Sequence, residues 1–236
     1  MILNLISSPR NVSTALMYSF ANRKDMFAVD EPFYAYYLEK TGALHPGREE
    51  IISSQKSDYS EVVKEIEVAG GSNDHIFIKN MAHHLIDMDL NFISNWCNII
   101  LIRNPKQLIA SFAQVIKNPK QADIGIKRQF EIVQFLKSQN HEFHILDSGI
   151  LLENPEKILS ILCRKVGIPM SSKMPSWTPH QCSQDGIWAK YWYANVHQSS
   201  GFSKQPTSSR RLPEDCVTLY EESKKYYNEL ISLAIK

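Results

Sequence analysis

Short apolar runs alternate with amphipathic helical patterns along most of the 236-residue chain. Because strand–helix–strand order is typical of parallel sheets, the alternation predicts an α/β fold in which helices cover both faces of a central, mainly parallel sheet. Strands are predicted at residues 1–7, 26–29, 75–79, 97–103 and 142–147. Helices are predicted at residues 13–24, 60–69, 105–115, 124–138 and 155–166. We expect Gly70 and Gly71 to end the second of these helices.

The C-terminal third departs from this alternation. Residues 167–211 are rich in Pro, Ser, Trp and Tyr and predict a long loop region of functional importance. A closing helix is predicted at residues 214–234, and its inward face is expected to consist of Leu219, Tyr226, Leu230 and Leu233. Since no linker or internal repeat interrupts the pattern, residues 1–236 are expected to form a single domain.

The composition restricts the partners that this chain can bind. Its 26 Lys and Arg against 25 Asp and Glu leave a formal charge of +1, so we expect neither nucleic acid nor an anionic membrane as a partner. No apolar run reaches the roughly 18 residues of a membrane span, and the N-terminal run lacks the basic start of a secretory signal. The four scattered cysteines are therefore expected to be reduced, in a cytoplasmic protein.

The loop at residues 7–14 (SSPRNVST) joins the first predicted strand to the first predicted helix. Ligands of open parallel sheets bind at the carboxyl ends of the strands, where this loop lies. Free N–H groups at the helix start, the hydroxyls of Ser13 and Thr14 and the charge of Arg10 suit a phosphate group. The alternative is a purely structural helix start, capped by Asn11 or Ser13.

The same loop differs from a Walker A sequence. When Thr14 is aligned with the final Ser/Thr of that motif, Ser7 and Val12 replace its glycines and Ser13 replaces its lysine. The missing lysine argues against hydrolysis of ATP or GTP. A P-loop phosphotransferase remains as an alternative function.

Two further charged residues end predicted strands. Arg103 follows the apolar run IILI, and Asn104-Pro105 then begin a helix that carries Ser111. This arrangement predicts a second anion site near the first. Lys79 likewise ends the strand HIFIK.

With these motifs in order, the chain resembles the sulfotransferases that use 3′-phosphoadenosine 5′-phosphosulfate (PAPS). SSPRNVSTALM resembles the family's 5′-phosphosulfate loop, IRNPKQLIAS its 3′-phosphate motif, and DSGILLENPEKILSILCRKVGIP the segment after its last strand. The resemblance is closest to bacterial-type, sulfotransferase-like P-loop proteins with SPR…ST and KNMAHH motifs. It implies a P-loop NTPase-like, three-layer α/β/α fold and transfer of a sulfuryl group from PAPS to a hydroxyl or amine of a small-molecule acceptor.

The resemblance also implies roles for single residues. The 5′-phosphosulfate would be held by Arg10, Asn11, Val12, Ser13, Thr14 and Ala15, with Val12 and Ala15 contributing backbone N–H groups. The 3′-phosphate would be held by Arg103 and Ser111. Lys79 matches the family lysine that stabilises charge on the bridging oxygen as the sulfuryl group leaves. No metal is expected.

The general base is less well defined by the motifs. The family histidine that follows the lysine by two residues is replaced here by Met81. Glu31, at the end of the second strand, and His83 and His84 are the candidates for deprotonating the acceptor. We favour Glu31, with His83 as a helper.

Val12 stands where many family members have glycine. If it weakens donor binding, the chain would be a catalytically decayed nucleotide-binding protein of the same fold. The late loop also lacks the family's Arg-Lys-Gly triplet, although Ser203 and Lys204 are candidates for its place.

The histidine pairs and the aromatic residues of the late loop each have two possible roles. His83-His84 and the pair His141 and His144 lack metal-ligand spacing, so structural roles are favoured. Aromatic residues of the late loop either stack on the ligands or form a small core: Trp177, Trp188, Tyr191, Trp192 and Tyr193. We expect the acceptor pocket to be built by loops at residues 33–48 and 170–202.

Overall fold

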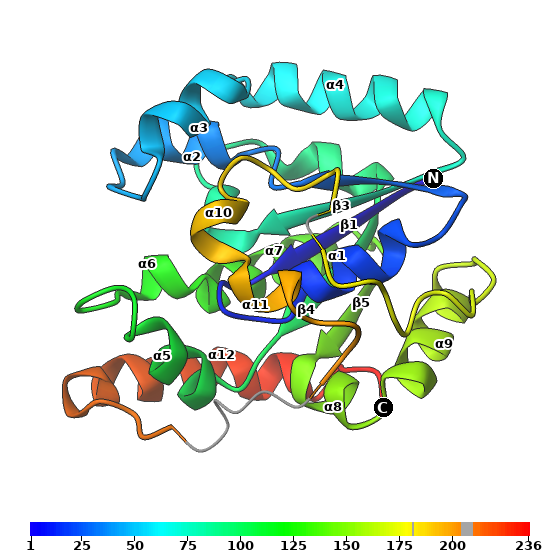
Figure 1. Cartoon of the computed structure of the whole chain (residues 1–236). Helices are drawn as coiled ribbons and strands as arrows, with labels where there is room; N and C mark the ends of the chain where they lie inside the picture. Colours follow the sequence, from blue (N-terminus) through cyan, green and yellow to red (C-terminus); the bar gives the residue numbers. More distant parts are fainter. Residues whose placement is uncertain (181, 204–209) are drawn as a thin grey trace.

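A computed structural model describes residues 1–180, 182–203 and 210–236. Within these residues a five-stranded sheet has the order β2-β3-β1-β4-β5, and every paired strand is parallel to its neighbour (Figure 1). The strands are β1 (Ile2–Ser7), β2 (Met26–Asp30), β3 (His75–Met81), β4 (Cys97–Ile102) and β5 (Phe143–Asp147). The predicted α/β fold with a parallel sheet is confirmed.

The strand register already places charged residues side by side. Asp30, the last residue of β2, lies opposite Lys79 of β3. Lys79 in turn lies opposite Leu5 of the central strand β1. The ends of three neighbouring strands therefore meet at one edge of the sheet.

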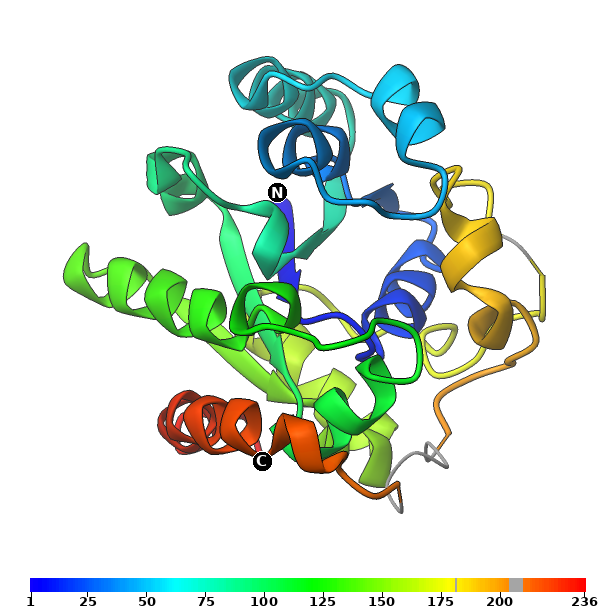
Figure 2. The ribbon, with the colours of Figure 1, turned by 90° about the vertical axis from the view of Figure 1, so that its left-hand side faces the viewer.

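Alternating side chains of the strands enter two separate hydrophobic cores. One core contains Ile6, Ile78 and Ile100, which pack against the helices α4, α5, α7 and α12. The other core contains Leu5 and Leu101, which pack against α1 and α9. Helices thus cover both faces of the sheet, and Figure 2 shows α1 and α7 on opposite sides of it.

The helices follow from local signals in the sequence. Asp58, Asn104 and Asn154 cap α4, α5 and α9 through their side chains, and proline occupies the first turn of α5 and α9. The α-helices are α1 (Ser13–Ala21), α2 (Tyr34–Thr41), α3 (Arg48–Ser54), α4 (Tyr59–Ser72), α5 (Pro105–Phe112), α6 (Gln121–Ile124), α7 (Ile126–Ser138), α8 (Ser148–Glu153), α9 (Pro155–Lys165), α10 (Ala189–Trp192), α11 (Ala194–His197) and α12 (Val217–Ile231). The 3₁₀ turns are η1 (Ala82–His84), η2 (Leu90–Asn95) and η4 (Glu214–Cys216).

Four details of the sequence prediction are wrong. Gly70 and Gly71 lie inside α4, because neither adopts the positive φ that would end the helix. The predicted helix at residues 124–138 is divided into α6 and α7 by Gly125, whose φ is 70°. Residues 33–48, predicted as a loop, contain α2. Leu233 is 46% exposed, since α12 ends at Ile231.

The long segment at residues 167–211 is only partly irregular. It contains α10 and α11, and Tyr193, which lies between these helices, contacts Lys79 of β3. Residues 181 and 204–209 of the segment lie outside the described residues. In the described part of the chain, no helix is long and apolar enough to cross a membrane.

Candidate active site

The loop between β1 and α1 is held by a buried polar network. Gln129 of α7 accepts a hydrogen bond from the Ser8 hydroxyl at 2.8 Å and donates to the carbonyl oxygens of Ile6 and Leu101. Asn11 donates to the Leu101 carbonyl at 3.0 Å. The loop is therefore fixed to β1 and β4, so its backbone groups are oriented before any ligand binds.

The start of α1 carries no side-chain cap in the described structure. Val12 is the N-cap residue, and the Asn11 side chain accepts only from the Val12 N–H at 3.0 Å. The alternative of a helix start capped by Asn11 or Ser13 is therefore wrong, because the Asn11 amide anchors the loop instead. The positive end of the helix dipole faces the adjoining cavities.

Arg10, Arg103 and Arg210 gather beside this helix start. Arg10 Nε donates to the Ser111 hydroxyl at 3.4 Å, and Arg103 donates to the Arg10 carbonyl. Burial, followed by repulsion from Arg10 and Arg210, lowers the pKa of Arg103 to about 10. Mutual repulsion of this kind is relieved when an anion binds among the cations.

These arginines line a cavity of about 330 Å³. Its other lining residues include Val12, Ala15, Ser111 and Ser203. The structure thus brings together the residues predicted to contact the 3′-phosphate, Arg103 and Ser111, with part of the β1–α1 loop. Lys204, the other candidate of the late loop, lies outside the described residues.

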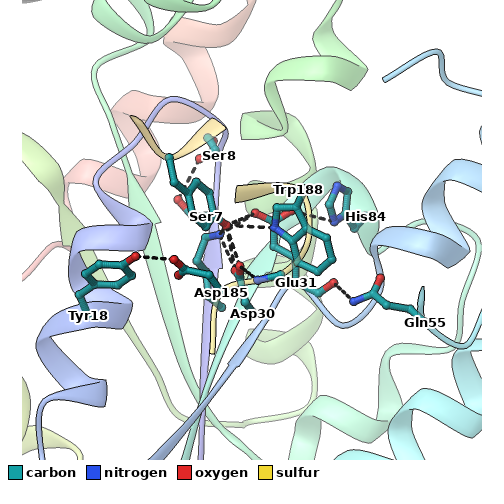
Figure 3. Close-up of polar contacts among 12 residues, drawn as sticks. Ser7, Ser8, Tyr18, Asp30, Glu31, Gln55, His84, Asp185 and Trp188 are labelled. Atoms are coloured by element: carbon teal, nitrogen blue, oxygen red, sulfur yellow. Dashed lines mark hydrogen bonds and ion pairs between the residues drawn. The ribbon is translucent and has the colours of Figure 1, made fainter. Parts of the chain in front are cut away.

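A second buried cluster surrounds the Lys79 ammonium group. Its Nζ lies 2.7 Å from Asp30 Oδ1 and 2.6 Å from Glu31 Oε1, and it also donates to the Tyr193 hydroxyl. Trp188 Nε1 donates to the same hydroxyl at 3.1 Å. Figure 3 shows Asp30, Glu31 and Trp188 converging on this point.

The backbone explains why Glu31 reaches the lysine. Glu31 has a φ of 40°, which is a left-handed conformation that a side chain other than glycine rarely adopts. The Glu31 N–H donates to the Lys79 carbonyl at 2.8 Å, and Gln55 donates to the Glu31 carbonyl at 3.0 Å. Both bonds hold the strained residue in place at the end of β2.

The charges in this cluster are strongly coupled. Burial alone would lower the pKa of Lys79, but Asp30 and Glu31 outweigh it and raise that pKa. Burial, with the charge of Asp30, raises the pKa of Glu31. Burial and the two carboxylates raise the pKa of Tyr193 well above its ordinary value, so Tyr193 is a proton donor here.

Beyond Lys79 the cavity is walled by aromatic rings. This second cavity has a volume of about 150 Å³. Glu31, Lys79, His83 and His84 line it together with Arg10, Asn11, Ser13 and Thr14 of the loop. All candidate catalytic residues therefore adjoin the candidate donor loop, as the sequence analysis predicts, although their individual roles stay predictions.

The two histidines are poor bases in this environment. Burial lowers the pKa of His83 to about 3 and the pKa of His84 well below its usual value. His84 Nδ1 lies 3.8 Å from Glu31 Oε2. Of the candidates, Glu31 is the one whose pKa moves toward the neutral range in which a general base works.

The aromatic residues of the late loop are expected either to contact the ligands or to form a small core, and the structure places some of them in each position. Trp192 and Tyr193 line both cavities. Trp177 and Trp188 are buried in hydrophobic clusters, whereas Tyr191 is 40% exposed. No group of three His, Cys, Asp or Glu side chains that suits a metal occurs in the described parts of the chain.

Sequence reasoning missed Asp30, which pairs with Lys79, and two cavity-lining residues, Asp123 and Arg210. Asp30 stands next to Glu31 at a strand end, and that position could have revealed it. No local sequence pattern marks Asp123 or Arg210, and the contact of Tyr193 with Lys79 is likewise not predicted.

A parallel five-stranded sheet with helices on both faces, and with a loop that joins its first strand to a helix start, defines an α/β/α protein of the P-loop-like class. Within that class, the chain belongs to the sulfotransferase domain family, whose model matches residues 1–230. The resemblance drawn from the motifs is confirmed at the level of the family.

Solved structures of similar fold support the same class. The chain is 14% identical to the sulfotransferase domain from the curacin biosynthetic pathway, with a TM-score of 0.56 and coverage of 100% of this chain and 98% of that one. It is 16% identical to the sulfotransferase domain of the Synechococcus PCC 7002 olefin synthase, with a TM-score of 0.55 and coverage of 94% and 93%. At these identities the likeness concerns the fold alone.

Two curated relatives carry a different name. The chain is 34% identical over 232 residues to branched-chain-amino-acid aminotransferase-like protein 1 of Arabidopsis thaliana, and 32% identical over 227 residues to protein 2. These matches cover 98% and 93% of this chain. The chain spans only 42% and 40% of the length of those relatives, so their name describes much longer proteins.

Proposed function

We propose that the protein transfers a sulfuryl group from PAPS to a hydroxyl or amine of a small-molecule acceptor. One observation carries the proposal: an arginine-lined cavity and a carboxylate–lysine cavity adjoin each other and share Arg10 and Tyr193. A donor with phosphates at both ends of its ribose fits the first cavity, and its sulfuryl group would then face the second. We extend the proposal to a single domain acting in a reducing, cytoplasmic compartment, which the four unpaired cysteines support.

The donor site would use charge and backbone dipoles. Arg103, Arg210 and Ser111 would bind the 3′-phosphate, and the start of α1 with Arg10 would bind the 5′-phosphosulfate. Because the loop is already fixed by Gln129 and Asn11, little ordering would be needed when the donor binds.

The chemical step would then be a direct displacement at sulfur. The acceptor oxygen forms a bond to sulfur while the bond from sulfur to the bridging phosphosulfate oxygen breaks. Glu31 takes the proton of the acceptor hydroxyl, and Lys79 stabilises the charge that develops on the leaving oxygen. The products are the sulfated acceptor and 3′-phosphoadenosine 5′-phosphate (PAP).

Val12 does not require the decayed alternative. Its φ of −85° and ψ of 27° lie in a region open to residues other than glycine, and its side chain is buried in the core beneath α1. Glycine is therefore not needed at this position, and the loop's positive φ falls on Arg10 instead. The phosphotransferase alternative still lacks a lysine at Ser13.

The proposal is tested by calorimetric titration with PAP, adenosine 5′-phosphate and ATP. We expect PAP to bind at least tenfold more tightly than adenosine 5′-phosphate, because only PAP carries the 3′-phosphate. Arg210→Ala, which changes an exposed side chain, should remove this preference, and Arg211→Ala is the matched control that should retain it. Tighter binding of ATP would favour the phosphotransferase, and the absence of all binding would contradict the proposal.

A further inference from the structure

Aromatic rings form much of the wall of the 150 Å³ cavity beyond Lys79. The Tyr34 ring stacks on His84 at a centroid distance of 4.5 Å, and Tyr37 stacks on the same imidazole at 4.8 Å. His83 meets Tyr37 edge to face at 5.1 Å. His45 completes the wall, where its Nδ1 lies 2.7 Å from the Tyr34 hydroxyl.

This wall carries no positive charge near neutral pH. Burial lowers the pKa of His45, of His83 to about 3, and of His84 well below its usual range. The Nδ1 atoms of His83 and His84 are buried and have no hydrogen-bond partner in the described structure. The wall therefore presents neutral rings to the cavity.

Carboxylates lie at two places on the cavity lining. Glu31 lies beside Lys79, whereas Asp123 lies near Tyr37 and His45. Burial, followed by the charge of Asp123, raises the pKa of Tyr37, and the same charge opposes the lowering of the His45 pKa by burial. Asp123 Oδ2 accepts from the Lys120 N–H at 2.7 Å, but no cationic side chain forms an ion pair with Asp123 among the described residues. This partly exposed carboxylate therefore keeps its negative charge without a cationic partner among the described residues.

The charge balance of the cavity depends on the donor. Once the phosphosulfate neutralises Arg10, the remaining cation of the lining is Lys79 among the described residues. Lys79 faces Asp30 and Glu31, and Asp123 adds a third carboxylate. The donor-loaded cavity is thus electronegative, which repels an anionic acceptor and attracts a cation.

We propose that the acceptor is a small ammonium alcohol, whose cation lies between Asp123 and the rings of Tyr37 and His45 and whose hydroxyl points toward Glu31. Aromatic faces combined with a carboxylate are the usual environment for organic ammonium groups. The cavity, with a volume of about 150 Å³, has room for a compact amino alcohol. This inference rests on the proposed sulfotransferase function.

The test uses protein saturated with PAP and a matched pair of alcohols. Choline and 3,3-dimethylbutan-1-ol have the same shape, but only choline is charged. Calorimetric titration is expected to show choline binding at least tenfold more tightly than the neutral alcohol, and 3-hydroxypropanoate binding more weakly than either.

Asp123→Asn keeps an oxygen that can accept from the Lys120 N–H while it removes the charge. This variant should bind choline at least fivefold more weakly and the neutral alcohol unchanged. Asp89→Asn is the matched control, because exposed Asp89 also accepts a backbone N–H at a helix start but lies outside the cavity. It should leave both affinities unchanged.

The outcomes separate the two proposals. If PAP binds but choline shows no advantage over the neutral alcohol, or if the hydroxy acid binds best, the ammonium-alcohol inference is wrong and the sulfotransferase proposal stands. The inference assigns the cation to the Asp123 carboxylate. A preference for choline that survives in Asp123→Asn would therefore also overturn the inference. If PAP itself does not bind, both proposals fail.

Discussion

Lys79 is enclosed by Asp30 and Glu31, and the side chains of Lys79 and Asp30 are each 1% exposed. Removing the lysine would leave two adjacent buried carboxylates without a cation. We expect Lys79→Met to lower the free energy of unfolding by about 3 to 5 kcal/mol, measured by urea denaturation at pH 7.5. Adding Glu31→Gln should restore part of this loss, because it removes one of the unpaired charges.

Lys56→Met is the matched control. Lys56 pairs with Glu61 at 2.9 Å, but both side chains are about half exposed. Its loss should lower the free energy of unfolding far less than the loss of Lys79, because solvent screens the exposed pair. Equal effects of the two substitutions would show that the buried cluster has no special electrostatic role.

His83 makes the stability depend on pH. Burial holds its pKa at about 3 in the folded protein, against 6.5 for an ordinary imidazole. Below pH 6.5 the unfolded chain therefore binds a proton that the folded chain does not, so stability is lost as the pH falls. By pH 5 this single group should cost about 2 kcal/mol relative to pH 7.5.

The measurement is urea denaturation at pH 7.5 and at pH 5.0. His83→Gln should reduce the pH-dependent loss, whereas His180→Gln, at an exposed position, should not. A loss that is identical in the wild type and in His83→Gln would contradict the assigned cause.

At the level of elements, α4 contains two glycines that no turn requires. A Cβ on Gly71 would meet nothing within 4 Å, and Gly71 is helical without a positive φ. We expect Gly71→Ala to raise the free energy of unfolding by about 0.5 kcal/mol, because alanine loses less backbone freedom on folding.

Gly42 provides the opposite control. It also has open space around its Cβ position, but its φ of 68° ends α2 in a left-handed conformation. Gly42→Ala should therefore destabilise the protein by about 1 kcal/mol. Stabilisation by both substitutions would mean that backbone conformation is not the deciding factor.

The elements also show how far sequence patterns reach. All five strands could be predicted, because each is a short, mainly apolar run, and β1, β3 and β4 are buried on both faces of the sheet. The helix α2, within residues 33–48, could not be predicted. Its aromatic residues pack against α3 and the late segment and do not form a simple amphipathic stripe. The site divides in the same way: Arg10 and Arg103 follow strand ends and Lys79 lies two residues before the end of β3, whereas the position of Tyr193 beside Lys79 depends on a tertiary contact that no pattern predicts.

At the scale of the whole molecule, PAP should connect the β1–α1 loop, α1, α5 and the late segment, because the residues that line its proposed cavity come from all of them. At a concentration 100 times its dissociation constant, such a ligand stabilises the folded state by about 2.7 kcal/mol. For a chain of this size we expect Tm to rise by about 5 to 10 °C in a thermal unfolding scan.

The comparison ligand for this scan is adenosine 5′-phosphate at the same concentration. It should raise Tm by a smaller amount, because it lacks the 3′-phosphate. Arg210→Ala should reduce the PAP effect to that of adenosine 5′-phosphate. Equal shifts for both nucleotides in the wild type would argue against the arginine-lined site.

The central position of β1 has a consequence for synthesis on the ribosome. β1 is made first among the strands, yet its partners β3 and β4 follow about 70 and 90 residues later. At about 5 to 20 residues per second, β1 waits roughly 4 to 14 seconds for β3. During that interval Leu3, Leu5 and Ile6 have no sheet to enter, so the nascent chain presents the apolar segment that chaperones bind.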